Sequence, residues 1–422
     1  MTSNGTTNIN PTPGPAGPAG PTDPTDPTDP TAGPAAPAGP AGELAAIRAE
    51  LRAVARDLLG KAGAVAGPDW PQLAAAGWLG LEVSADLDGA GATFAETAVI
   101  AEELGRAAAR TPFLGAIVLG VGALREAGPG DARDVLLAQA AAGEEVPVAL
   151  VPDGAPFRLT KEKGGEERTR LSGHAPFLPD AGQASRLLIV AYPADHGSVS
   201  GGGGDGGPVL VSVRPDAPGL RVTDLPVLDQ TRRLAEVDAD GVAVAADDVW
   251  SFGGDPRAAI QRLRDRAAVA LACDSLGVAE AMLAATVSYV KVRQQFGRPI
   301  GSFQAVKHAC ADMLVQVTVA RGLVAAAVEA LAEPGEARAS READAGVAAS
   351  MAKSYACAVA VEVAGKAMQL HGGVGYARES GIHAYLKRAA LNRDLFGSPA
   401  AHRARLAGRY QAASGKTHHM VD

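Results

Sequence analysis

The hydrophobic pattern of the chain changes twice along its length, and the changes divide it into three parts. From residue 43, apolar residues recur at spacings of three and four, which is typical of amphipathic helices. Between residues 146 and 250, short β-branched runs separated by Pro, Gly and Asp indicate strands. From residue 256 to about 412 the helical spacing returns in longer segments. The pattern therefore predicts a mainly α protein with a middle β-domain.

The predicted helices are short in the first part and long in the last. They cover 43–59, 70–76, 93–108, 114–127 and 130–142, and then 256–292, 303–331, 337–370 and 380–391. The predicted strands cover 146–151, 186–192, 207–215 and 241–250. Because the long helices are joined by short connections, we expect them to form an antiparallel bundle.

Two segments have compositions that do not favour a packed core. Residues 1–41 are rich in Pro, Ala, Gly and Thr and contain PTDPTDPTDPT, so we expect a disordered tail. The run SVSGGGGDGGP at 198–208 is expected to be a flexible insertion between two strands. The predicted domains are then a helical domain at 42–145, a β-domain at 146–252, a helical bundle at 253–412 and a tail at 413–422.

Composition and charge exclude several classes of function. The chain is 47% hydrophobic but only 4% aromatic, so its interior must consist largely of Ala, Leu and Val. A net charge of −8 without any Lys/Arg-rich run argues against nucleic acid as a partner. The N-terminal residues contain no secretory signal and no run of about 20 residues is continuously apolar, so we expect a cytoplasmic protein without a membrane span. Cys273, Cys310 and Cys357 lie far apart without His at metal-ligand spacing, so no metal site is expected.

The first motif with chemical meaning is YVKVRQQFGRPIGSFQ at 289–304, where one predicted helix ends and another begins. Arg293 has a planar fork of donors that suits a pyrophosphate, and Phe296 has a ring face suited to stacking. Gly297 and Pro299 favour a break between the helices. Taken alone, an Arg at a helix end is more often a solvated surface residue.

The second motif is QLHGGVGY at 369–376, at the next predicted helix break. Its paired glycines allow a ligand to approach backbone amides closely. A single GGxG pattern is weak evidence for a binding site. Two such motifs at helix breaks of one predicted bundle are strong evidence together.

With these two motifs the sequence resembles the acyl-CoA dehydrogenase family over about 43–412, including GWLGL…EELGRA near the N-terminus and LDQTRRLAEVDADGV at 228–242. The resemblance implies an N-terminal α-domain, a β-barrel-like middle domain and a C-terminal four-helix bundle, assembled as a tetramer of two dimers. It also implies the cofactor FAD, an acyl-CoA substrate from fatty acid or sterol side-chain metabolism, and an electron-transfer flavoprotein or similar acceptor.

In the family, FAD lies across a dimer interface and is held mainly by the neighbouring subunit. The positions that match the family's contacts to the ADP half of FAD are Arg293, Phe296, Phe303, Gln304, Gln369, Leu370, His371, Gly372 and Gly373. Phe177 matches a family Trp and is expected to stack on the flavin ring.

The chain departs from the family where the family has its catalytic base. The family reaction removes an α-proton while a hydride leaves the β-carbon for the flavin, so it requires a proton acceptor. The two family positions for this base fall on Phe396 and Ala267, whose side chains cannot accept a proton. Asp265 is the alternative acid, although an acid near the start of a helix more often serves the helix dipole. Glu379 is a further acid for which a capping role is expected.

The β-domain also departs from the family around the flavin ring. The family segment Leu-Thr-Glu-Pro appears here as ALVPDG at 149–154. The later Trp-Ile-Thr matches Phe177, Leu178 and Pro179, and a proline has neither a hydroxyl nor a backbone donor.

The sequence leaves several functions open. The first is FAD-dependent α,β-dehydrogenation of an acyl-CoA thioester, as a subunit of a homo- or hetero-oligomer. The second is a catalytically silent partner subunit that contributes FAD contacts to an active subunit, similar to some bacterial steroid-degrading acyl-CoA dehydrogenases. The others are a self-sufficient dehydrogenase with a relocated base, and a protein of the same fold with different flavin chemistry or a structural role.

Overall fold

A computed structural model describes residues 40–62, 66–162, 168–194, 207–332, 336–377 and 380–417. The chain divides into two compact units, residues 1–46 and 47–422. The PTD repeat of the expected tail lies outside the described residues. The elements discussed below belong to the second unit, into which helix α1 (Pro40–Ala62) continues from the first.

Short helices form the N-terminal part of this unit. They are α2 (Trp70–Ala75), η1 (Ala85–Leu87), α3 (Phe94–Arg106), η2 (Leu114–Val121), α4 (Gly122–Glu126) and α5 (Asp131–Ala142). Capping boxes fix the N-termini of α2 and α3, because Asp69 and Thr93 each exchange hydrogen bonds with the residue three positions later.

The helix expected at 114–127 has a different geometry over most of its length. Residues 114–121 form a π-helix, residues 122–126 form an α-helix, and residue 127 lies beyond its end. Gly120 lies so close to the neighbouring strand that a Cβ there would be 1.7 Å from the carbonyl oxygen of Pro147. Glycine at this position therefore allows the π-helix to pack directly against the sheet.

The β-domain is one sheet in the order β6-β7-β3-β2-β4-β5-β8, with β1 also paired to β4. Its strands are β1 (Pro147–Leu150), β2 (Phe157–Glu162), β3 (Arg168–Pro179), β4 (Arg186–Pro193), β5 (Val209–Val213), β6 (Leu220–Leu225), β7 (Leu234–Val244) and β8 (Val249–Trp250). β1 and β2 run parallel to β4, and the other pairs are antiparallel. The Gly-rich segment expected as an insertion lies between the antiparallel neighbours β4 and β5, and most of it is outside the described residues.

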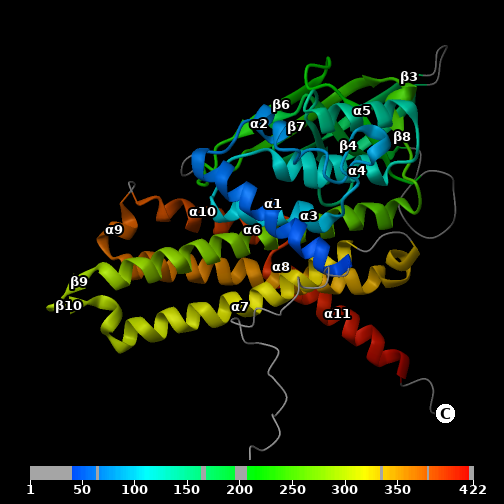
Figure 1. Ribbon diagram of the computed structural model, residues 1–422. Coiled ribbons are helices and arrows are strands. Elements are labelled where there is room, and N and C mark those ends of the chain that lie inside the picture. Colours follow the sequence, from blue (N-terminus) through cyan, green and yellow to red (C-terminus); the bar gives the residue numbers. More distant parts are fainter. Residues whose placement is uncertain are drawn as a thin grey trace, which may run out of the picture. The chain divides into compact units, whose positions relative to one another are not determined.

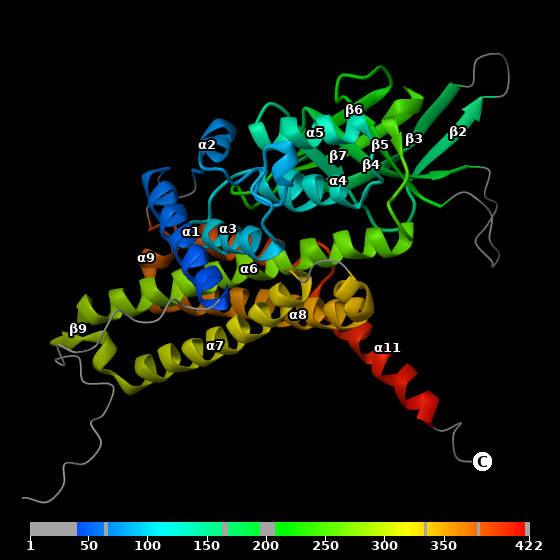
Figure 2. The same cartoon turned by 45° about the vertical axis from the view of Figure 1, so that its right-hand side comes forward.

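Long helices make up the C-terminal part, where α6, α7 and α8 lie side by side in both views (Figure 1 and Figure 2). The helices are α6 (Pro256–Val292), α7 (Gln304–Ala332), α8 (Glu336–His371), α9 (Gly373–Tyr376), α10 (Ile382–Asp394) and α11 (Pro399–Thr417). A small hairpin, β9 (Gln294–Gln295) with β10 (Arg298–Pro299), and η5 (Ile300–Ser302) connect α6 to α7. α8 packs against α6, α7, α10 and α11, and its buried face is mostly alanine, which permits close helix packing. This arrangement confirms the expected fold class.

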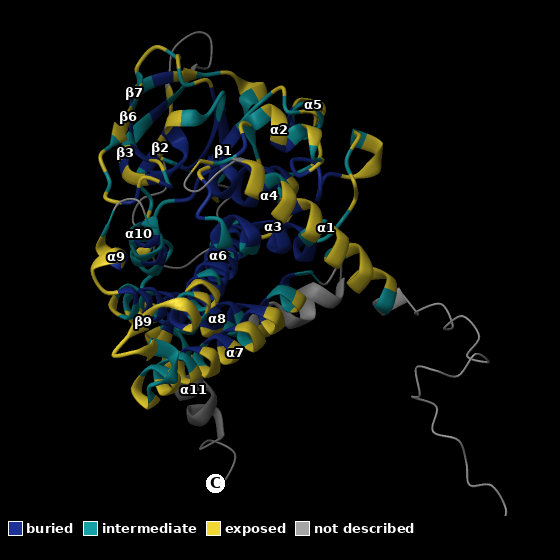
Figure 3. Ribbon diagram, turned by 60° about the vertical axis from the view of Figure 1, so that its left-hand side comes forward, coloured by how far each residue is buried: buried dark blue, intermediate teal, exposed yellow. Residues whose placement is uncertain are grey.

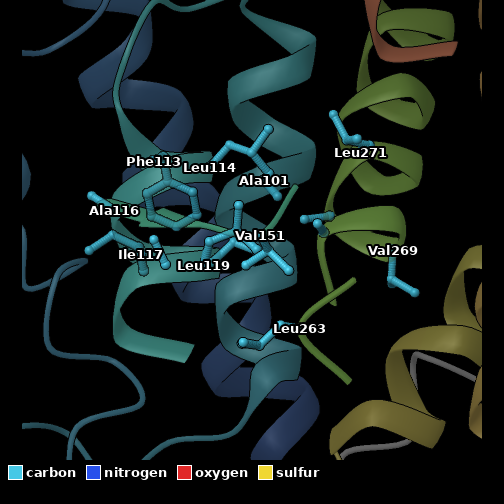
Figure 4. Close-up of a cluster of buried hydrophobic side chains, with 14 of the residues drawn as sticks. Ala101, Phe113, Leu114, Ala116, Ile117, Leu119, Val151, Leu263, Val269 and Leu271 are labelled. Atoms are coloured by element: carbon cyan, nitrogen blue, oxygen red, sulfur yellow. The ribbon is translucent and has the colours of Figure 1, made fainter. Parts of the chain in front are cut away.

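The core is continuous through the helical part, the sheet and the bundle. Figure 4 shows Phe113, Leu114 and Ile117 of the segment around η2 beside Ala101 of α3 and Leu271 of α6. In Figure 3 most of α6 is buried while α7 has a long exposed face.

Three helices, Pro256–Val292, Gln304–Ala332 and Asp344–His371, are long and apolar enough by composition to cross a membrane. Their length and composition alone therefore do not exclude a membrane span. Burial within the bundle accounts for the apolar character of the first and third, because most of their apolar windows are covered.

A buried polar network joins the bundle, the sheet and the N-terminal helices. Arg388 of α10 donates to both carboxylate oxygens of Asp274 of α6, at 2.8 and 2.5 Å. The same guanidinium donates to the carbonyl oxygen of Ala109 and to the hydroxyl of Thr231. Arg232 also contacts Asp274, at 3.0 Å. Burial alone would raise the pKa of Asp274, but the two guanidinium groups hold it below its ordinary value.

Replacing Asp274 by Asn is expected to lower the free energy of unfolding by about 3–5 kcal/mol, because two buried guanidinium groups lose their counter-charge. Guanidinium-induced unfolding followed by circular dichroism measures the change. Asp57→Asn is the matched control, since its ion pair with Lys61 is exposed, and it should cost less than about 1 kcal/mol. Equal effects of the two substitutions would contradict the importance of the network.

Candidate functional site

The two sequence motifs lie together at one end of the bundle. The ring of Tyr289, near the end of α6, stacks on the ring of His371 at the end of α8, with centroids 4.4 Å apart. The Tyr289 hydroxyl also donates to the carbonyl oxygen of His371 at 3.4 Å. The Arg-x-x-Phe motif and the Gly-rich motif therefore belong to one surface, which we call the bundle end and define as residues 289–304 and 369–376.

The hairpin of the bundle end presents aromatic and cationic groups to solvent. Phe296 has a positive φ of 51° and is 90% exposed. The Phe296 and Phe303 rings pack edge to face with centroids 6.1 Å apart, and the Arg298 guanidinium lies 4.1 Å from the centroid of Phe303. Arg293, where α6 ends, is exposed beside them. An exposed phenyl ring in a left-handed conformation is unusual, and such strained residues cluster at ligand sites.

The Gly-rich motif leaves its backbone open. Gly372 has φ 60° and ψ −140°, a region that is essentially restricted to glycine. A Cβ added at Gly372 or Gly373 would meet nothing within 4 Å, so a ligand can approach both backbones. Gln369 is exposed and Leu370 is half-buried, while Gln304 is exposed at the start of α7.

A separate cavity of about 410 Å³ lies where the sheet meets the connection between α10 and α11. We call it the sheet cavity. Residues from three segments line it: the end of β1 with the following loop, the end of β3, and the α10–α11 connection. Phe177 and Phe396 both line it and both have positive φ, at 58° and 53°. The structure thus brings the altered segment at 149–154, the altered segment at 177–179 and the first base position together.

The second base position and the alternative acid Asp265 both lie on α6 and do not line this cavity. Ala267 is fully buried inside α6. Asp265 is buried and accepts hydrogen bonds from Arg405 of α11 at 2.7 and 3.3 Å, and from Gln261 at 3.0 Å. Neither is among the residues that line the sheet cavity. Asp265 therefore fastens α11 to α6, and Glu379 lies outside the described residues.

Sequence reasoning missed three polar residues that line the sheet cavity, namely Asp153, His174 and Asp394. His174 pairs with Asp238 directly across the sheet, with 2.7 Å between its Nδ1 and the carboxylate. Asp394 lies two positions before Phe396, which was the only signal for it in the sequence. Among the described residues no group of three or more His, Cys, Asp or Glu side chains is arranged to hold a metal ion.

Asp180 links the sheet to the π-helix next to the sheet cavity. It follows Pro179, is fully buried, and accepts a hydrogen bond from the backbone N–H of Gly115 at 2.8 Å. Burial raises the pKa of Asp180 to about 6, although this hydrogen bond and the nearby Arg232 and Arg388 oppose the shift.

The raised pKa of Asp180 predicts a pH dependence of stability. Between about pH 4 and 6 the folded chain binds a proton that the unfolded chain releases, so stability falls as pH rises through this window. The loss for this residue is roughly 3 kcal/mol at most. In urea titrations between pH 4.5 and 7.5, Asp180→Asn should remove this part of the decline. The exposed Asp216→Asn is the control and should keep the wild-type profile. Parallel profiles for wild type and Asp180→Asn would contradict the prediction.

The bundle end and the sheet cavity fit FAD unequally. At the bundle end a guanidinium fork, an exposed ring and two open glycine backbones form a surface that fits the ADP half of the cofactor. At the sheet cavity the Phe177 ring, which is 63% exposed, can stack on a flavin ring. Pro179 cannot donate a hydrogen bond there. The fit to the flavin ring is therefore limited to apolar contact.

Comparison with known proteins confirms the resemblance read from the motifs. A family model described as "Acyl-CoA dehydrogenase, N-terminal domain" matches residues 43–144, and one described as "Acyl-CoA dehydrogenase, C-terminal domain" matches 257–411. The acyl-CoA dehydrogenase IpdE2 of Mycobacterium tuberculosis is 32% identical over 319 residues, covering 76% of this chain and 79% of IpdE2.

Two solved structures have a similar fold. The Tcur3481-Tcur3483 steroid ACAD is 27% identical, with a TM-score of 0.72 over 88% of this chain and 99% of that one. The ChsE4-ChsE5 complex from Mycobacterium tuberculosis shares the fold at 23% identity, with a TM-score of 0.73 over 86% of this chain and 97% of that one.

Proposed function

Because the chain belongs to the acyl-CoA dehydrogenase family of FAD-dependent oxidoreductases acting on CH–CH groups, we propose that it is a subunit of a hetero-oligomeric acyl-CoA dehydrogenase. In this proposal its bundle end contributes contacts to FAD held mainly by a related subunit. That subunit supplies the catalytic base.

The observation that carries the proposal is Phe396. It lines the sheet cavity at the position where the family resemblance places a carboxylate, and a phenyl ring cannot accept the substrate's α-proton. The second base position, Ala267, is buried and also has no proton acceptor. Asp265, the remaining acid, is already paired with Arg405.

The bundle end supports the FAD part of the proposal. Arg293 would pair with the pyrophosphate, Phe296 would stack against the adenosine, and the Gly372–Gly373 backbone would allow close approach. Bound FAD supplies the hydride acceptor for α,β-dehydrogenation. A cofactor and a second subunit that cover this exposed phenyl ring would remove its apolar surface from water.

The proposed assembly also includes substrate and acceptor. The solved Tcur3481-Tcur3483 protein is a steroid ACAD with two named components. Its similarity to this chain supports an assembly of two subunits and an acyl-CoA substrate with a steroid-derived chain. A tetrameric assembly, an electron-transfer flavoprotein or similar acceptor, and a cytoplasmic location follow from the family resemblance and complete the proposal.

Purification of the full chain alone, and together with a related subunit from the same source, tests the proposal. The chain alone should be colourless or contain little bound flavin. The co-produced complex should show a flavin spectrum that bleaches on addition of acyl-CoA. A yellow single-chain protein whose flavin is bleached by acyl-CoA would overturn the proposal, because it would contain its own base and complete flavin site.

Arg293→Met in the co-produced complex should weaken FAD retention by roughly 10- to 100-fold, since a charge-assisted hydrogen bond to phosphate is lost. Equilibrium dialysis against free FAD measures the effect. Arg257→Met, at the exposed start of α6, is the matched control and should leave retention unchanged. Equal retention in both variants would exclude Arg293 from the cofactor site.

A further inference from the structure

A buried lysine of α8 binds the α10–α11 connection, which contains Phe396. Lys353 of α8 is fully buried, and its Nζ donates to the carbonyl oxygens of Asn392 at 2.9 Å, Arg393 at 3.1 Å and Gly397 at 2.9 Å. An ammonium group has three N–H donors, so these three acceptors use all of them.

This lysine satisfies the C-terminal end of α10. The last carbonyl groups of a helix have no partner within it, and a cation there is favoured by the helix dipole. Burial lowers the pKa of Lys353, although the nearby Cys357 and Asp394 oppose this shift. Because one Nζ binds carbonyls on both sides of residues 394–396, it fixes where the chain leaves α10.

A second buried side chain fixes the same connection from α11. Nε2 of His402 lies 2.9 Å from the carbonyl oxygen of Phe396, so this nitrogen donates. Burial lowers the pKa of His402, which favours a neutral ring with its proton on Nε2. Gly397 has φ 96°, and a Cβ there would be 2.9 Å from the same nitrogen, so the contact requires glycine.

The contacts that hold this connection involve backbone atoms of residues 392, 393, 396 and 397, and none involves a polar side chain at position 396. Lys353 and His402 therefore hold the backbone at and on both sides of Phe396, whose φ is positive. Whichever side chain stands at 396 is directed from the same backbone, beside the sheet cavity.

We propose that Lys353 and His402 are positioning residues that keep position 396 preformed as a proton-acceptor site, so that the missing base is the loss of one side chain. This inference rests on the proposed function, in which the chain has no base of its own. It predicts that Phe396→Glu restores proton abstraction from an acyl-CoA.

The restored step can be followed without oxidation of the substrate. The carboxylate introduced by Phe396→Glu would take the α-proton of a bound acyl thioester, and the electron pair of the C–H bond would move onto the thioester as an enolate. Return of a deuteron from D2O to the α-carbon regenerates the acyl thioester. Electrons balance without any oxidant, and deuterium in the recovered acyl-CoA records the event.

The experiment uses the full chain without its partner, so that no other base contributes, with butyryl-CoA and a longer branched acyl-CoA as probes. Mass spectrometry measures deuterium at the α-carbon. Wild type and Phe396→Gln should match the solvent background, and Phe396→Glu should exceed it by at least about tenfold. Deuterium incorporation by Phe396→Glu no greater than by Phe396→Gln would overturn the inference.

Variants of the two positioning residues separate their role from general stability. In the Phe396→Glu background, His402→Gln should keep the exchange, because its amide N–H can replace the Nε2 donor, and His402→Leu should remove most of it. Lys353→Met should also remove it. Lys353→Met leaves three buried acceptors unpaired and can unfold the chain, so thermal unfolding is measured for each variant. If Lys353→Met is unfolded, the comparison of His402→Gln with His402→Leu decides the outcome.

Unchanged exchange in the folded His402→Leu variant would overturn the positioning role. Exchange by the wild-type chain would have a different meaning. It would reveal another base and would overturn the proposed function.

Discussion

The buried ion pair between Arg388 and Asp274 is the contact on which the arrangement of the second unit depends. One guanidinium reaches a carboxylate of α6, a backbone carbonyl after α3 and a hydroxyl of the sheet segment before β7. Burying these charges is costly, and only their mutual contacts offset the cost. The helices, the sheet and the bundle must therefore keep one relative position around α10. Since α10 leads directly into the connection with Phe396, the same network also sets the position of the sheet cavity.

The bundle end and the sheet cavity have changed to different degrees. At the bundle end a cation, aromatic rings and open glycine backbones remain, and the Phe296 side chain is 90% exposed. At the sheet cavity the backbone framework remains while Phe396 and Pro179 provide neither a proton acceptor nor a donor. A chain of this kind can serve a cofactor shared with a neighbour while lacking proton transfer of its own. This contrast is the physical basis of the proposed division of labour between two related subunits.

Much of the fold could be predicted because long helices and buried strands leave a periodic pattern. The boundaries of α6 matched the expected 256–292 for this reason, with Asp255 as its cap. β2, β3 and β6 escaped prediction because they mix polar residues and glycine with few β-branched ones, and their pairing depends on strands distant in sequence. α11 was also missed, since its sequence is rich in small and charged residues and has few large apolar ones. The π-helix depends on the close approach of β1 to Gly120, which no local pattern encodes.

The sequence by itself determined the family resemblance, the three-part architecture and the residue types of both sites, because motifs and periodicity are local properties. Only the tertiary structure decided which of these residues meet. It joined Tyr289 to His371, placed Phe177 and Phe396 on one cavity, and paired Asp265 with Arg405 instead of leaving it free to act as a base. It also gave Lys353 its role, since a lysine in an alanine-rich helix is recognised as a cap only when the carbonyls of a distant helix end meet it. Contacts between segments far apart in sequence follow from packing, and packing is a property of the whole fold.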